Sequence, residues 1–287
     1  MVVGVVEYIG RFMVHWRDIV LPAFADRVHQ GHKAKEGIHI NLKGFAIGNG
    51  LTDLQIQYGA YADYALNMGL ITQSDHDSID TLFPKCKQVV QQWLPTKGGD
   101  TCGFTFPPCI GIFSKIKHNT GKINSCEEGH WCSDFLNMET FLNQKTVRDA
   151  LGVGDIELVT CSRAVYEAIF QDWMKNLEAG IPAHLEDGLK VLIYAGEYDL
   201  ICNWLGNSNC VHAMEWSGQN QFGTSPTVHD AGHMVPMDQP KAALHMIKSW
   251  MADKCRHGGA DKADPQMLKS LMAGKVAVAC ADSEIAT

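Results

Sequence analysis

Two short segments of the chain hold the residue types of a hydrolytic proton relay. The segment AGEYDLICNWLGN, residues 195–207, is rich in acids and directly follows an apolar run, whereas VHDAGHMVPMDQP, residues 228–240, holds two histidines. In one large group of hydrolases, the nucleophile, the acid and the histidine follow one another in this order along the chain. The histidine takes the proton of the nucleophile, and a buried carboxylate fixes its tautomer and stabilises the imidazolium. We therefore predict that these segments supply an acid and a base.

Strands and helices alternate around these segments. Buried strands are predicted at 41–48 and 189–195, where apolar runs end at glycines or charged residues. Helical patterns cover residues 22–35, 57–68, 134–151, 162–179, 203–216 and 240–251, and another helix begins at Ser74. Gly152 is expected to stop the helix at 134–151. The alternation predicts an α/β fold with a mostly parallel sheet, in which the acid follows the carboxyl end of a strand.

Several longer motifs then make the comparison specific. KGFAIGNGLTD (43–53), VRDALGVGD (147–155) and the two segments above resemble the motifs of the serine carboxypeptidases, most closely the plant members. The resemblance runs from about Pro22 to Trp250 and implies an α/β-hydrolase fold. It also implies release of C-terminal residues from peptides through an acyl-enzyme, with Asp199 as the acid and His233 as the base. His229 and Asp230 are then expected in a turn, and Asp238 as the cap of the last helix.

The residue that should attack the peptide is missing from the expected place. The family carries a Gly-Glu-Ser-Tyr turn just ahead of LPAFADRVHQG, and here His15 occupies the serine column. No G-x-S-x-G occurs in the 287 residues, since GNSNC at 206–210 lacks the final glycine. Loss of such a serine costs about 10⁶-fold in turnover, so we expect an inactive chain. Cys202 is a conceivable substitute nucleophile, although the resemblance indicates a residue that lines the site.

The expected domain organisation follows from this comparison. Residues 1–21 are a divergent N-terminus, and 22–253 form a partial α/β-hydrolase domain that lacks the N-terminal strands and the nucleophile turn. A cysteine-rich insertion spans about 70–150, with a loop-rich part at 84–133, and residues 254–287 are predicted to be a disordered tail. The stretch before His229 is shorter than in the family and lacks a strand, which leaves the position of His233 open. We expect such a chain to be marginally stable or to aggregate.

The cysteines indicate an oxidising compartment. Ten are present, five of them within residues 86–132, and such density is typical of disulfides. A zinc site is the alternative, but no C-x-x-C pair occurs. The resemblance implies that Cys86 pairs with Cys109 and Cys126 with Cys132, and that Cys202 is a free thiol. It also implies a vacuolar or extracellular location, although residues 1–16 do not read as a signal peptide.

Composition limits the partners. The net charge of −8 and the pI of about 5.9 argue against nucleic acid, and no apolar run is long enough to span a membrane. The sequence predicts no cofactor and no metal site, and it leaves the oligomeric state open. Peptide C-termini are the partners that the resemblance implies. Two alternatives stay open: a non-catalytic binding or regulatory relative, and an acyltransferase that uses the same triad.

Overall fold

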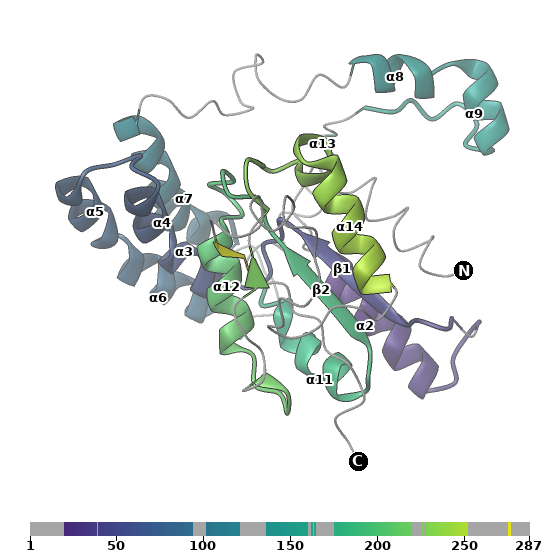
Figure 1. Cartoon of the computed structure of the whole chain (residues 1–287), viewed down its shortest axis with the longest axis horizontal. Coiled ribbons are helices and arrows are strands. Elements are labelled where there is room, and N and C mark those ends of the chain that lie inside the picture. The colour runs from purple at the N-terminus through teal and green to yellow at the C-terminus, as the bar shows by residue number, and fades with distance from the viewer. Residues whose placement is uncertain are drawn as a thin grey trace.

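A computed structural model gives the arrangement of the chain (Figure 1). It describes residues 20–38, 40–93, 102–120, 136–159, 162, 164, 175–219, 225–226, 228–251 and 275–276. Within these ranges, no helix is long and apolar enough to cross a lipid bilayer. His15, Cys126 and Cys132, for which the sequence made specific predictions, lie outside the described residues.

Two parallel strands form the centre of the described fold. Strand β1 (Gly44–Gly48) pairs with β2 (Lys190–Tyr194) in the register Gly44 to Lys190. Both lie inside the predicted strands, and each is shorter than predicted. Beyond β2, an isolated parallel bridge joins Gly196 to Val228. Helices alternate along the chain with two strands that pair in parallel, which confirms the predicted α/β class.

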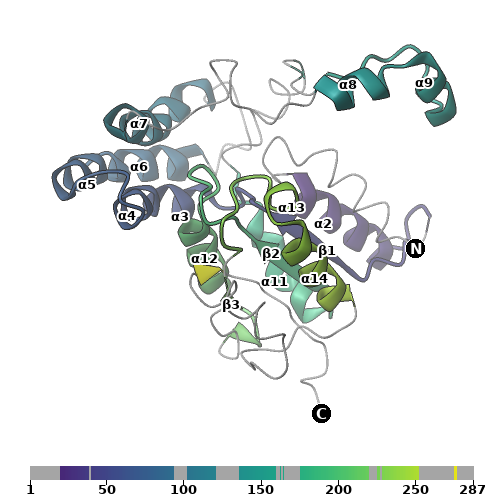
Figure 2. The ribbon, with the colours of Figure 1, turned by 45° about the horizontal axis from the view of Figure 1, so that its top comes forward.

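Alternating side chains of the two strands bury both faces of the sheet. One face packs its β-branched and aromatic residues against helices α2, α11 and α12, whereas the other packs against α14 (Figures 1 and 2). Leu192 and Trp250 form the centre of the second contact. Helices on both sides of the sheet thus explain why both strands are continuous apolar runs in the sequence.

The helices have the following bounds. They are α2 (Val20–Lys33), α3 (Leu54–Gly59), α4 (Tyr61–Asn67), α5 (Gln73–Asp80), α6 (Phe83–Trp93), α7 (Cys102–Thr120), α8 (Leu136–Leu142), α9 (Lys145–Leu151), the 3₁₀ turn η4 (Glu178–Gly180), α11 (Ile181–Glu186), α12 (Trp204–Ala213), α13 (Val235–Asp238) and α14 (Pro240–Met251). Two further strands, β3 (Ser225–Pro226) and β4 (Lys275–Val276), pair antiparallel.

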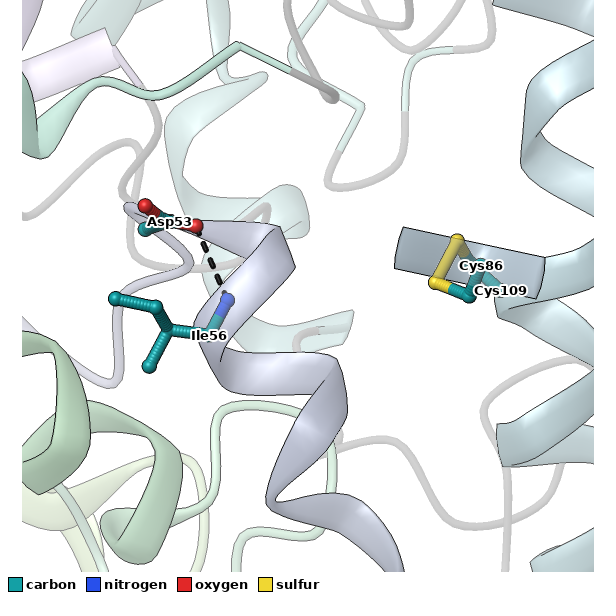
Figure 3. The surroundings of a disulfide bond; sticks show 4 residues. All are labelled: Asp53, Ile56, Cys86 and Cys109. Atoms are coloured by element: carbon teal, nitrogen blue, oxygen red, sulfur yellow. Dashed lines mark hydrogen bonds between the residues drawn. A yellow bond between two sulfur atoms is a disulfide. The ribbon is translucent and has the colours of Figure 1, made fainter. Parts of the chain in front are cut away.

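The cysteine-rich stretch is helical wherever it is described, so the prediction of a loop-rich segment is wrong for α6 and α7. A disulfide joins Cys86 of α6 to Cys109 of α7, as the resemblance implied (Figure 3). Ile112 and Ile116 of α7 are also buried in the core that these helices share with α3, α4 and α5. Pro107 and Pro108 lie inside α7 and remove two backbone donors, yet this packing holds the helix together.

Two other local predictions also need correction. The helix predicted at 162–179 is not continuous to its end, because Asn176 and Leu177 are non-helical and a 3₁₀ turn follows them. The Asn176 side chain donates to Asp53 and accepts from the Ala179 amide, which fixes this break. Asp238 does not lie at the start of the last helix but ends α13, and its carboxylate accepts the Gly232 amide. By contrast, Gly152 ends α9 in the left-handed conformation, as predicted.

Candidate active site

The carboxyl ends of β1 and β2 bring together the first components of the site. Asn49 follows β1 in a left-handed conformation and donates its amide to the carbonyl of Tyr194 at the end of β2. Its side-chain Nδ2 donates to Asp199 Oδ2 over 2.8 Å. Clefts at the carboxyl ends of parallel strands are the usual ligand sites of open α/β sheets. The parallel pairing of β1 and β2 therefore explains why Asp199 lies beside Asn49 at the carboxyl ends of the strands.

Three donors surround the Asp199 carboxylate. Besides Asn49, the Cys202 amide donates to Oδ1 over 3.0 Å, and the Nδ1 of His233 lies 2.7 Å from Oδ2. Asp199 is 6% exposed, whereas the His233 side chain is 31% exposed. Because a carboxylate only accepts, His233 must donate its Nδ1–H, which leaves the other ring nitrogen for a second partner.

The electrostatics of the pair favour the charged forms of both groups. Burial alone raises the pKa of Asp199, but the hydrogen bond and charge of His233, with the Cys202 and Asn49 donors, outweigh burial and lower it. Burial alone lowers the pKa of His233, yet the hydrogen bond to Asp199 and the neighbouring Cys202 raise it above its ordinary value. An ionised carboxylate in this position orients the imidazole and stabilises the imidazolium that forms when the ring takes a proton.

Two tyrosines of α4 hold the loop that carries the acid. Tyr61 Oη donates to the carbonyl of Ile201 over 2.6 Å, and Tyr64 Oη donates to the carbonyl of Glu197 over 2.7 Å. Both rings are buried. The acid loop is thus fixed from the helical layer as well as from β2.

The histidine loop packs directly on the acid loop, backbone against backbone. The Tyr198 amide donates to the carbonyl of Ala231 over 2.9 Å. A Cβ on Gly196 would lie 2.1 Å from the carbonyl oxygen of Gly232, so only glycine allows this approach. The shortened stretch before His229 therefore does not prevent His233 from reaching Asp199.

Cys202 lies beside the pair and completes the only group of described residues close enough to hold a metal ion. The ligand atoms of Asp199, Cys202 and His233 all lie within 4.8 Å of one another. Both oxygens of the carboxylate already accept hydrogen bonds, however. Cys202 itself is a fully buried thiol outside any disulfide, as the resemblance implied. The arrangement is that of a carboxylate orienting an imidazole, with a thiol packed against them.

Sequence reasoning found some of these residues and missed others. It named Asp199 and His233, which the structure brings into contact, and it placed Asp230 in a turn, where its backbone is left-handed. It assigned no role to Asn49, although this residue follows a predicted strand within a motif that had been singled out. It also did not foresee that Glu197 contacts His229, since no local pattern links two residues 32 positions apart.

A buried aspartate bonded to a histidine beyond the carboxyl ends of parallel strands is the arrangement of an α/β-hydrolase. Comparison with solved structures agrees on the fold: the crystal structure of Kex1(delta)p, a prohormone-processing carboxypeptidase from Saccharomyces cerevisiae, superposes with a TM-score of 0.64 at 20% identity. The match covers 81% of this chain and 59% of that one. The sequence model of the family described as serine carboxypeptidase matches residues 19–227 and 224–253. The chain belongs to the serine carboxypeptidase family.

Curated relatives support the same assignment. Serine carboxypeptidase-like 48 of Arabidopsis thaliana is 57% identical over 263 residues, which cover 82% of this chain and 52% of the relative. Serine carboxypeptidase 3 of Oryza sativa subsp. japonica is 52% identical over 264 residues, with coverages of 82% and 53%. The chain thus spans about half the length of these two relatives. A serine carboxypeptidase-like protein of Pisum sativum is 53% identical over 259 residues, which are 80% of this chain and 90% of that protein.

Proposed function

We propose that this chain carries the acid and the base of a serine carboxypeptidase, Asp199 and His233, for release of C-terminal residues from peptides. The observation that carries the proposal is the 2.7 Å contact between these two side chains, one buried and one open to solvent. Peptides with a free C-terminus are the substrate class that family membership supports.

In the proposed reaction, each group has a defined task. His233 takes the proton of a serine hydroxyl as the serine oxygen bonds to the scissile carbonyl carbon, and Asp199 stabilises the imidazolium. His233 then gives the proton to the leaving amine, the C–N bond breaks, and an acyl-enzyme remains. Water attacks this ester by the same proton transfers, which releases the shortened peptide and restores the serine.

We further propose that the 287-residue polypeptide does not catalyse this reaction by itself. No G-x-S-x-G is present in it, and the histidine in the expected serine column cannot form the acyl ester of this mechanism. The buried thiol of Cys202 is the remaining candidate attacker, and full burial closes it to a peptide carbonyl. The expected turnover is therefore that of the uncatalysed reaction.

The first experiment assays the purified polypeptide with a blocked dipeptide and with a serine-reactive phosphonate. No turnover and no labelling are expected. Turnover that disappears in His233→Gln would contradict the proposed inactivity, and its disappearance in Cys202→Ala as well would identify a thiol nucleophile. Turnover that persists in His233→Gln would come from a contaminant, and further purification is expected to remove it.

A second experiment tests the acid and the base directly. The part of Arabidopsis serine carboxypeptidase-like 48 that this chain lacks is fused ahead of residues 22–253. We expect the fusion to hydrolyse the blocked dipeptide, and Asp199→Asn to lower turnover by about 10⁴-fold. A folded fusion whose activity survives both Asp199→Asn and His233→Gln would exclude the proposed roles.

We also propose a vacuolar or extracellular location. The Cys86–Cys109 disulfide supports it, because such bonds persist in oxidising compartments. A fluorescent fusion that accumulates in the cytosol of plant cells, with both cysteines reduced, would contradict this location.

A further inference from the structure

A second carboxylate–histidine pair lies beside the first and is not used in the proposed reaction. The Nδ1 of His229 lies 3.0 Å from Glu197 Oε2, and both side chains are largely buried. Glu197 lies two residues before the acid, and His229 four residues before the base. Among the described residues, none hydrogen-bonds to the buried Nε2 of His229. A ring that donates from Nδ1 fits the contact with Glu197, because a carboxylate only accepts.

Glu197 also holds the backbone next to His229. The same Oε2 atom accepts the Asp230 amide over 3.2 Å. Asp230 is in the left-handed region at φ 52°, a conformation that side-chain-bearing residues avoid without local support. On its other side, the Asp230 carboxylate accepts the hydroxyl of Tyr198 over 3.1 Å. Two consecutive residues of the acid loop therefore fix one turn of the histidine loop.

This turn determines where the base lies. His233 follows Asp230 by three residues, and the intervening Ala231 and Gly232 are bound to the acid loop only through backbone contacts. A shift of the turn would therefore move the backbone of the histidine loop and change the distance from His233 to Asp199. The Glu197 side chain spans the two loops by contacting both His229 and the Asp230 amide, and the Asp230–Tyr198 hydrogen bond joins the same loops beside it.

We propose that Glu197 is a positioning residue, which clamps the left-handed turn at His229–Asp230 and thereby fixes His233 against Asp199. The inference deepens the proposed function and rests on it for its catalytic meaning. The clamp itself is a physical property of the 287-residue polypeptide, and it can be measured without any turnover.

The experiment compares the NMR signals of the His233 ring in the full polypeptide and its variants, with His233→Gln for assignment. In the wild type we expect a strongly low-field Nδ1–H resonance and a raised titration midpoint. Glu197→Ala should broaden this resonance beyond detection and lower the midpoint by about one pH unit or more. Glu197→Gln keeps an oxygen that can accept the Asp230 amide, so it should retain most of the wild-type signal.

The matched control is Glu186→Ala. Glu186 likewise accepts a backbone amide and a side chain, both from Ser217, but it lies on α11 away from the histidine loop. We expect this variant to leave the His233 signals unchanged even where it lowers stability. An unchanged His233 resonance in folded Glu197→Ala, or an equal loss in Glu186→Ala, would overturn the proposal.

Should Glu197→Ala fail to fold, Tyr198→Phe decides the matter, because Tyr198 is 55% exposed and its hydroxyl donates to the Asp230 carboxylate of the clamped turn. It should lower the His233 midpoint in the same direction by a smaller amount, and no shift at all would overturn the clamp. A wild type without the low-field resonance would instead contradict the proposed acid–base pair. The two failures are therefore distinguishable.

Discussion

Glu178 gives the sharpest prediction about the stability of this chain. It lies in the 3₁₀ turn η4, is 6% exposed, and its Oε2 is buried without a hydrogen-bond partner. Burial, followed by the nearby charge of Asp53, raises its pKa from 4.5 to about 8, while a contact with Cys210 acts weakly in the opposite direction. The folded protein therefore keeps a proton on Glu178 at neutral pH, whereas the unfolded chain has lost it.

The sign and size of the effect follow from proton linkage. Between about pH 4.5 and pH 8, the folded state binds one proton more at Glu178 than the unfolded state does. The free energy of unfolding must fall as pH rises through this window, by roughly 1.4 kcal/mol per pH unit. The contribution is fully present below pH 4.5 and is lost above the folded pKa. Summed over the window, the loss amounts to roughly 4–5 kcal/mol.

Glu178→Gln removes the proton exchange and keeps the shape of the side chain. We expect it to match the wild type near pH 4.5 and to exceed it by several kcal/mol at pH 8. Urea unfolding at pH 5, 6.5 and 8 measures the difference, with the exposed Glu215→Gln as the matched control. Parallel stability curves for the wild type and Glu178→Gln would refute the reasoning, as would an equal change in the control.

Three further predictions concern other sites. Burial, followed by the charge of the neighbouring His29, lowers the pKa of His184, so its contribution to the free energy of unfolding is present above about pH 6.5 and is lost as pH falls. His184→Leu should therefore reduce the fall of the unfolding free energy below about pH 6.5, measured by urea unfolding. Replacing Cys86 and Cys109 by alanine opens a loop with a sequence separation of 23 residues and should cost roughly 3.4 kcal/mol in denaturant unfolding, with no further effect of reductant. Gly196→Ala forces the two site loops apart and should abolish the low-field imidazole resonance while the disulfide still forms; a retained resonance would contradict the close approach.

The strands and the positions of Asp199 and His233 next to each other could be predicted because their signals are local. Strand β2 is an uninterrupted apolar run, and the acid follows it within a few residues. The family motifs around Asp199 and His233 are long enough to be recognised one at a time, and each lies on one continuous segment. The α/β class follows from the same alternation of patterns.

The errors share a physical cause, since each depends on contacts between distant segments. Pro107 and Pro108 favour a loop when α7 is considered alone, but a disulfide to α6 and a buried face stabilise the helix. Asp238 has the residue type of a helix cap, yet it ends α13 and its carboxylate accepts the Gly232 amide. In both cases, contacts with distant segments outweigh the local conformational preference of the residue.

The contacts of the acid–base pair indicate how this half of the fold holds its geometry. Asp199 is bound by Asn49, which directly follows β1, by the Cys202 amide from its own loop, and by His233. All three contacts therefore come from the end of β1, the loop after β2 and the histidine loop. None of these three partners belongs to a nucleophile strand, so the pair can adopt its orientation before a serine is supplied. This is why the fusion proposed above should recover activity by adding an attacker, without any change to the residues that receive its proton.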